Sequence, residues 1–217
     1  MAAAEELVAA GATVLQYRNK TGNARVMLEQ ARELRRCLGV RDQNPHAEIA
    51  NDAILERVTH AENVPLKAGS LLSEPAVWLI MNDRADLCVA ADFDGVHVGQ
   101  EDLSPEAVRA IIGSGRCLGV STHNPDQLRE AELTSADYLA IGPVFATSSK
   151  ERPDPVVGLE GVRRARALTR KPLVAIGGIT RSNAASVIEA GADSVAVISD
   201  LLRDPGKSAE EFFRVLR

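Results

Sequence analysis

From about residue 74 onward, short apolar runs alternate with amphipathic stretches, and this alternation limits the possible folds more than any other feature of the chain. Each run is short enough for one strand and is followed by residues typical of a helix start. Strands that alternate with helices form a parallel sheet covered by helices. We expect strands at residues 77–81, 95–98, 117–121, 138–142, 172–177 and 194–198.

The upstream residues extend the same pattern. We expect a further strand at residues 12–18 and helices at residues 2–10, 24–38, 85–91, 104–113, 124–134, 158–169, 181–190 and 207–217. Ser104 and Asn124 each precede a proline, which is typical of an N-cap followed by the first helical position. Eight helices against seven strands predict a (β/α)8 TIM barrel that lacks its first strand, which would normally precede the first helix.

Residues 39–74 interrupt the alternation, at a point where a βα unit needs only a short loop. We interpret them as an insertion in a single domain that spans residues 1–217. Residues 64–72 are one candidate for the missing strand. A start site placed too late is the explanation that we favour.

Composition excludes several classes of function. The 25 basic and 30 acidic residues give a net charge of −5, so we expect no bulk attraction to nucleic acid or to an anionic membrane surface. The three cysteines lie far apart, which favours reduced thiols in the cytoplasm over disulfides or a metal site. The first residues lack a basic signal-peptide region, and no apolar run is long enough to span a membrane. Any anion binding must therefore come from local clusters.

The first cluster is Gln16, Arg18 and Lys20. Their spacing by two places all three on one face of a strand. Two cations and an amide on that face indicate an anion site at the carboxyl end of the strand, where parallel α/β folds bind ligands. A solvated edge strand is the alternative, which Val14 disfavours because it lies deeper on the same face.

Carboxylates follow the next two strands. Asn82 and Asp83 end one strand, and Asp102 follows the next. The carboxylates of Asp83 and Asp102 could converge on one Mg²⁺, which commonly takes one or two protein carboxylates plus substrate phosphates. Helix capping explains their positions equally well.

A hydroxyl-rich loop follows the strand at residues 138–142. Thr147, Ser148 and Ser149 can donate to phosphate oxygens, and Lys150 adds a positive charge. The alternative is an ordinary solvated loop.

The last two strands end in Gly177–Gly178 and Ile198–Ser199. They correspond to strands seven and eight of a complete barrel, which form the usual phosphate site of that fold. Glycine allows backbone N–H groups to approach an oxyanion, and a following helix N-terminus adds its dipole. Close packing would also explain the glycines.

Two histidines and one basic run need separate interpretation. His97 lies mid-strand and is expected to be a packed core residue, whereas His123 could contact a ligand or cap a helix. We interpret the basic run as a solvated helix face; its residues are Arg163, Arg164, Arg166, Arg170 and Lys171.

Taken together, six motifs resemble the thiamine phosphate synthase family, in order and with near-family spacing over residues 1–38 and about 75–205. They are QYRNK at 16–20, NDRAD at 82–86, GVHVGQED at 95–102, GVSTH at 119–123, GPVF at 142–145 and AIGGI at 175–179. The resemblance implies an enzyme that joins 4-amino-5-hydroxymethyl-2-methylpyrimidine diphosphate to thiazole phosphate, with release of diphosphate and with Mg²⁺ as cofactor.

The resemblance also implies roles for individual residues. Asp83 and Asp102 would bind Mg²⁺, Lys150 would contact the departing diphosphate, and Ser121 would lie near the pyrimidine. The residues that would hold the pyrimidine diphosphate are Gln16, Arg18, Lys20 and Asn82. Those on the thiazole phosphate side are Thr147, Ser149, Gly178, Ile198 and Ser199.

Two alternatives stay open. A thiazole tautomerase shares the barrel and the phosphate site, and would use His123 as its acid–base residue. A non-catalytic barrel that binds thiamine phosphate would explain the missing strand. The retained cations and carboxylates favour the synthase, acting on phosphorylated small molecules in the cytoplasm, with a homo-oligomer as one possible assembly.

Overall fold

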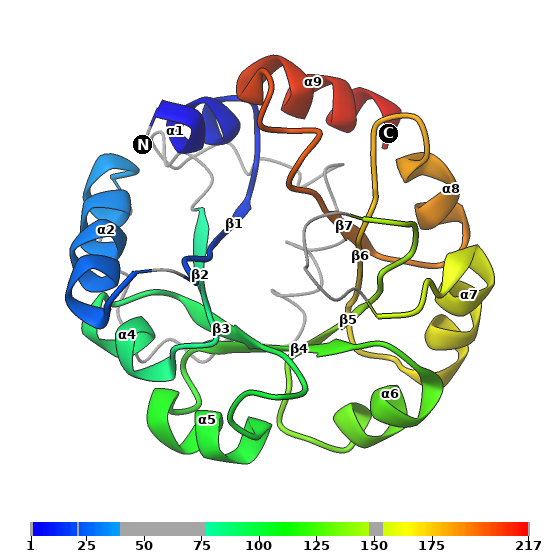
Figure 1. The fold of residues 1–217 in the computed structure, drawn as a ribbon, viewed down its shortest axis with the longest axis horizontal. Helices are drawn as coiled ribbons and strands as arrows, with labels where there is room; N and C mark the ends of the chain where they lie inside the picture. The colour runs from blue at the N-terminus through cyan, green and yellow to red at the C-terminus, as the bar shows by residue number, and fades with distance from the viewer. Residues whose placement is uncertain (1, 21, 40–76, 148–153, 217) are drawn as a thin grey trace, which may run out of the picture.

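The computed structural model describes residues 2–20, 22–39, 77–147 and 154–216. Their strands form one parallel sheet in which strand order follows chain order, from β1 to β7. Figure 1 shows the strands at the centre with the helices in a ring around them. The predicted α/β barrel architecture is therefore confirmed.

The observed elements begin and end within a few residues of the predicted positions. The strands are β1 (Val14–Tyr17), β2 (Trp78–Asn82), β3 (Gly95–Val98), β4 (Cys117–Thr122), β5 (Tyr138–Ile141), β6 (Leu173–Ile176) and β7 (Ser194–Ala196). The helices are α1 (Ala2–Ala9), α2 (Ala24–Cys37), α4 (Ala85–Ala90), α5 (Pro105–Ile112), α6 (Pro125–Glu132), α7 (Gly158–Leu168), α8 (Ala184–Glu189) and α9 (Pro205–Val215).

Side-chain caps fix the starts of several helices. The side chain of Asn23 accepts a hydrogen bond from the N–H of Val26, and Ser104 accepts one from Ala107. Asn124 accepts from two backbone N–H groups at the start of α6, and Gln127 accepts from the N–H of His123. These bonds satisfy donors that the first helical turn leaves free, as the Ser–Pro and Asn–Pro pairs predicted.

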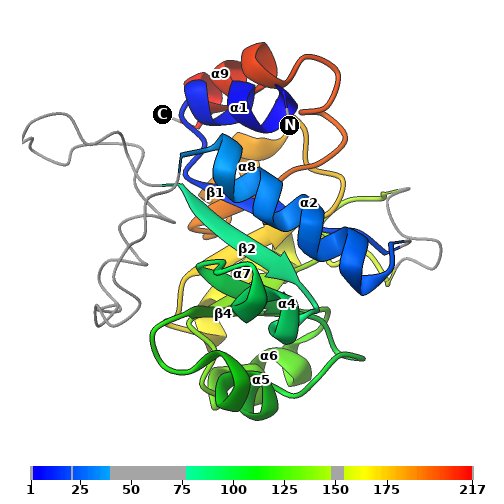
Figure 2. The same cartoon turned by 90° about the vertical axis from the view of Figure 1, so that its left-hand side faces the viewer.

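Among the described strands, β1 and β7 are the two ends of the sheet. Helices α1 and α9 pack against each other on this side, so the outer ring of helices continues across it (Figures 1 and 2). Val14 was expected to be buried, but it is 42% exposed because β1 pairs only with β2 in this part of the chain. The predicted insertion at 39–74, including residues 64–72, lies almost wholly outside the described residues.

The main hydrophobic core lies between the sheet and the helices, and consists mostly of Ala, Val, Leu and Ile side chains. A second, smaller cluster contains Ile80, Cys117 and Tyr138, with Trp78 and Val174 packed against it. Its members come from β2, β4, β5 and β6. None of the helices in the described ranges has the length and apolarity needed to cross a bilayer.

At the amino-terminal edge of the sheet, three aspartates make the same pair of hydrogen bonds to the backbone. Asp94, Asp137 and Asp193 each stand directly before a strand. Each carboxylate accepts a hydrogen bond of 2.7 Å from a backbone N–H of the preceding strand, and each aspartate N–H donates to the carbonyl of that same residue. The paired residues are Leu79, Leu118 and Leu173. This edge lies opposite the carboxyl ends of the strands, where such folds bind ligands, so these hydrogen bonds stabilise the sheet on the side away from the ligand edge.

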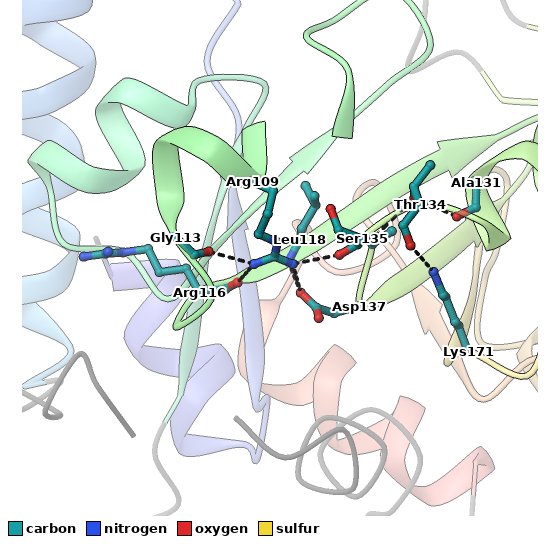
Figure 3. Close-up of polar contacts among 10 residues, drawn as sticks. Arg109, Gly113, Arg116, Leu118, Ala131, Thr134, Ser135, Asp137 and Lys171 are labelled. Atoms are coloured by element: carbon teal, nitrogen blue, oxygen red, sulfur yellow. Dashed lines mark hydrogen bonds and ion pairs between the residues drawn. The ribbon is translucent and has the colours of Figure 1, made fainter. Parts of the chain in front are cut away.

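Arginines reinforce two of these aspartates. Arg109 donates to Asp137 at 2.6 Å and to three backbone carbonyls, as Figure 3 shows. Arg166 donates to Asp193 at 2.7 Å. The interpretation of the basic run as a solvated face is therefore wrong for Arg166, and also for Lys171, which is half-buried and donates to the Thr134 carbonyl. Arg163 and Arg164 are exposed as predicted.

Candidate active site

The carboxyl end of β1 carries three exposed polar side chains. Gln16, Arg18 and Lys20 are exposed, whereas Tyr17 and Asn19 between them are half-buried. This alternation puts the three on one face of the strand and its continuation. The shared face follows from the predicted spacing, and the binding role of these residues stays a prediction.

Lys20 lies beside Asp83, the first residue after β2. The distance between Lys20 Nζ and Asp83 Oδ2 is 3.6 Å. Asp83 has a φ of 63°, a left-handed conformation that aspartate tolerates better than most residues, and its N–H donates to the His97 carbonyl at 2.9 Å. The backbone thus fixes Asp83 within reach of Lys20, which lies three residues after the end of β1.

Asp102, in the loop after β3, brings a second carboxylate to the same place. Its Oδ2 accepts a hydrogen bond from the N–H of Gly99 at 2.8 Å. Burial raises the pKa of Asp83 and the neighbouring Asp102 carboxylate raises it further, whereas Lys20 lowers it. Two carboxylates this close repel each other unless a proton or a cation lies between them.

Neither aspartate acts as a helix cap. Arg84 is the N-cap of α4, and Ser104 caps α5. Mg²⁺ commonly binds through one or two carboxylates plus phosphate oxygens, and this pair, with its mutual repulsion, fits such a site. The described residues contain no group of three or more His, Cys, Asp and Glu side chains that could hold a metal.

Ser121 near the end of β4 is hydrogen-bonded to a buried histidine. His97 Nε2 lies 2.7 Å from Ser121 Oγ, and His97 Nδ1 lies 2.8 Å from the hydroxyl of Tyr138. Burial lowers the pKa of His97 to about 4, so its imidazole is neutral at pH 7. His97 is packed in the interior as predicted, but its link to Ser121 was not foreseen.

His123 connects the ends of two strands. Its Nδ1 donates to the Gly142 carbonyl at 2.6 Å, and its Nε2 lies 3.5 Å from an Asp154 carboxylate oxygen. Both ring nitrogens therefore have protein partners. His123 precedes the N-cap of α6 and is not itself the cap.

Glycines allow the ends of β5 and β6 to approach closely. A Cβ atom on Gly142 would lie 2.2 Å from the Ile176 carbonyl oxygen, and one on Gly178 would lie 2.5 Å from the Ala146 carbonyl oxygen. Gly177 and Gly178 also have positive φ values. These contacts confirm that close packing requires the glycines. A phosphate site at the same place is compatible with that packing and stays a prediction.

The chain after β7 continues this edge. Pairing of β6 with β7 ends at Ile176 and Ala196, two residues before Gly178 and Ile198. Ile198 is 47% exposed and Ser199 is also exposed. Asp200 next to them accepts hydrogen bonds from the backbone and the side chain of Arg181. Arg181 therefore anchors the loop that presents Ser199.

Comparison with known proteins gives one consistent family. Residues 56–201 match the family model described as thiamine monophosphate synthase. A thiamine-phosphate synthase from Koribacter versatilis is 53% identical over 98% of this chain and 84% of its own length. The chain belongs to the thiamine monophosphate synthase family. This confirms the family expected from the six motifs.

Other members of the thiamine monophosphate synthase family are also similar. A thiamine-phosphate synthase from Chloroflexus aurantiacus is 40% identical over 90% of this chain and 74% of its own length. The solved structure of a thiamine phosphate pyrophosphorylase from Pyrococcus furiosus superposes with a TM-score of 0.76, at 30% identity, over 99% of this chain and 88% of that one. The likeness therefore extends over almost the whole fold.

The structure describes most, but not all, of the residues predicted for a synthase site. Thr147 is described and half-buried. Ser148, Ser149 and Lys150 lie outside the described residues. Tyr138 was not among the residues expected at the site, because a tyrosine at the start of a strand resembles an ordinary core residue until its hydroxyl partner is known.

Proposed function

We propose that this protein is a thiamine phosphate synthase, a transferase. Its substrates would be 4-amino-5-hydroxymethyl-2-methylpyrimidine diphosphate and 4-methyl-5-(2-phosphooxyethyl)thiazole, and its products thiamine monophosphate and diphosphate. The observation that carries this proposal is the juxtaposition of Lys20, Asp83 and Asp102 at the carboxyl ends of consecutive strands. Membership of the family supports it.

The chemistry begins with loss of diphosphate from the pyrimidine methylene carbon. The C–O bond breaks, its electron pair leaves with diphosphate, and a methylene cation remains. Arg18 and Lys20 would offset, with their positive charge, the negative charge that develops on the leaving group. Gln16 and Asn82 would orient the pyrimidine diphosphate, and Lys150 would contact the departing diphosphate.

Asp83 and Asp102 would hold Mg²⁺. When bound, the metal would supply Lewis-acid stabilisation of the leaving diphosphate. Binding of the metal would also displace the proton that the raised pKa of Asp83 favours at low pH.

The nucleophile is the thiazole nitrogen, which attacks the methylene cation and needs no general base. The phosphate of the thiazole substrate would bind at another part of the edge formed by the carboxyl ends of the strands, where the glycine-rich end of β6 meets the end of β7. The residues proposed for this phosphate are Thr147, Ser149, Gly178, Ile198 and Ser199. Two separate anion sites on one edge would allow a chain of net charge −5 to bind two phosphorylated substrates.

The test is formation of thiamine monophosphate from the two substrates, with and without Mg²⁺. We expect coupling that depends on Mg²⁺ and releases one diphosphate per product. Metal-independent exchange of the thiazole tautomers without coupling would instead identify a tautomerase that uses His123. Tight binding of thiamine phosphate without turnover would identify a binding protein.

A cytoplasmic location is part of the proposal. Cys37, Cys88 and Cys117 are all free thiols, and two of them are buried. Free cysteines persist in reducing compartments, whereas exported proteins of this size tend to pair them.

A further inference from the structure

We propose that Tyr138 and His97 are positioning residues that fix the Ser121 hydroxyl as a hydrogen-bond donor toward an acceptor atom of the pyrimidine substrate. The inference rests on the proposed function for the identity of the substrate, but the orientation of the hydroxyl follows from the protein alone. The three residues come from β5, β3 and β4, and they form one hydrogen-bonded chain, which we call the Tyr–His–Ser relay.

The positions of the protons in the relay follow from counting donors. The Tyr138 hydroxyl is buried, and among the described residues its hydrogen-bond partner is His97 Nδ1 alone. If Nδ1 carried the proton and donated to Tyr138, the tyrosine hydrogen would be buried without an acceptor. That arrangement is disfavoured by about tenfold or more. Tyr138 therefore donates to Nδ1, and Nδ1 is unprotonated.

The second half of the relay follows from the first. An imidazole ring whose Nδ1 lacks a proton carries its one remaining ring proton on Nε2. His97 Nε2 donates to Ser121 Oγ over 2.7 Å. The hydroxyl oxygen thus accepts from histidine, and its own hydrogen stays available to a ligand. Ser121 is a donor in this arrangement, and His97 cannot act as its base because Nε2 is already protonated.

Packing holds the relay in one geometry. A Cβ atom on Gly119 would lie 2.1 Å from Tyr138 Cζ and 2.5 Å from His97 Nδ1, so the tyrosine–histidine bond occupies the space that a side chain there would need. Ile80 and Cys117 pack with the Tyr138 ring. Gln100 Nε2 donates to the Ser121 carbonyl at 2.6 Å, which fixes the serine backbone as well.

The relay itself is tested on the protein without substrate. Nitrogen-15 NMR of histidine-labelled protein at pH 7 distinguishes a protonated ring nitrogen from an unprotonated one. His97 is assigned as the signal that the His97→Gln variant lacks among the four histidines. We expect the proton on Nε2 and a free Nδ1. A proton on Nδ1, or on both nitrogens, overturns the proposal.

The function of the relay is tested by a double-mutant cycle on kcat/KM for coupling. Tyr138→Phe keeps the packed ring and removes only the donor to Nδ1, and Ser121→Ala removes the hydroxyl. We expect each to lower kcat/KM about tenfold, and the double variant to match Ser121→Ala alone. If the fold loss in kcat/KM of the double variant instead equals the product of the two single losses, Tyr138 does not act through Ser121.

A matched control removes a serine hydroxyl elsewhere. Ser135 is exposed and lies at the amino-terminal edge of the sheet, opposite the candidate site, so Ser135→Ala should leave kcat/KM within about twofold of the unsubstituted protein. If the unsubstituted protein does not couple the substrates, the proposed function fails while the NMR result still decides the relay. If coupling is normal but the tautomer is wrong, the relay alone fails.

Discussion

Acidification from pH 7 to pH 4 should destabilise the fold through His97. Burial lowers the pKa of this imidazole from an ordinary value of 6.5 to about 4. Between these values the unfolded chain takes up a proton on His97 that the folded chain does not. The free energy of unfolding therefore falls as the pH falls through this window.

Linkage gives the size of the effect. With pKa values of about 4 folded and 6.5 unfolded, the His97 contribution lowers the free energy of unfolding by roughly 2 kcal/mol at pH 5 and roughly 3 kcal/mol at pH 4. Domains of this kind have a total stability of about 5–15 kcal/mol, so the loss is large enough to measure.

A variant that cannot titrate isolates the contribution of His97. Asp83 acts in the opposite sense, because its pKa is raised in the folded state, so the pH dependence of the unsubstituted protein alone is a sum. Urea unfolding of the protein and of His97→Gln, followed by circular dichroism at pH 7, 6 and 5, gives the difference. We expect the stability advantage of the unsubstituted protein to shrink by roughly 2 kcal/mol between pH 7 and pH 5. Parallel stability curves for the two proteins would refute the assignment of His97 as a buried neutral imidazole.

Three further predictions concern the rest of the fold and the candidate site. Asp137→Asn should lower the free energy of unfolding by about 1–3 kcal/mol in urea titrations, because it weakens the partly buried bonds to Arg109 and Leu118. Asp126→Asn, in an exposed ion pair, should lower it by less than about 1 kcal/mol. Equal losses in the two variants would contradict the stabilising role of Asp137 at the amino-terminal edge. Lys20→Met should raise the KM for the pyrimidine diphosphate about tenfold or more, and Lys207→Met on the exposed face of α9 should leave it unchanged; an unchanged KM in the first variant removes Lys20 from the site. Gly178→Ala should raise the KM for the thiazole phosphate, because the added methyl group meets the Ala146 carbonyl oxygen and φ is 65°; wild-type kinetics would show that the edge adapts without cost.

Much of the fold could be predicted because its local signals agree. The strands from β2 to β7 are apolar runs bounded by helix starts, and Ser104 and Asn124 cap helices where their prolines indicated. The convergence of Asp83 and Asp102 could be predicted as well, since consecutive parallel strands end at one edge. Each of these features depends on nearest neighbours along the chain or in the sheet.

The features that could not be predicted depend on which partner a side chain meets across the barrel. Arg166 belongs to a basic run, yet it is partly buried because Asp193 precedes the next strand. The bond from Tyr138 to His97 joins residues 41 positions apart and needs the space that Gly119 leaves. Val14 fits a buried pattern, and its exposure follows from the position of β1 at the end of the described sheet.

The central claim is that the carboxylates of Asp83 and Asp102 hold the metal used in coupling. The direct measurement is the rate of thiamine monophosphate formation at saturating Mg²⁺ by Asp83→Asn and Asp102→Asn, each checked for unchanged folding by circular dichroism. Asparagine tolerates the left-handed φ of 63° at position 83, so the backbone is preserved. We expect both variants to lose on the order of 100-fold in rate. Rates within about twofold of the unsubstituted protein, with unchanged dependence on Mg²⁺, would contradict the claim.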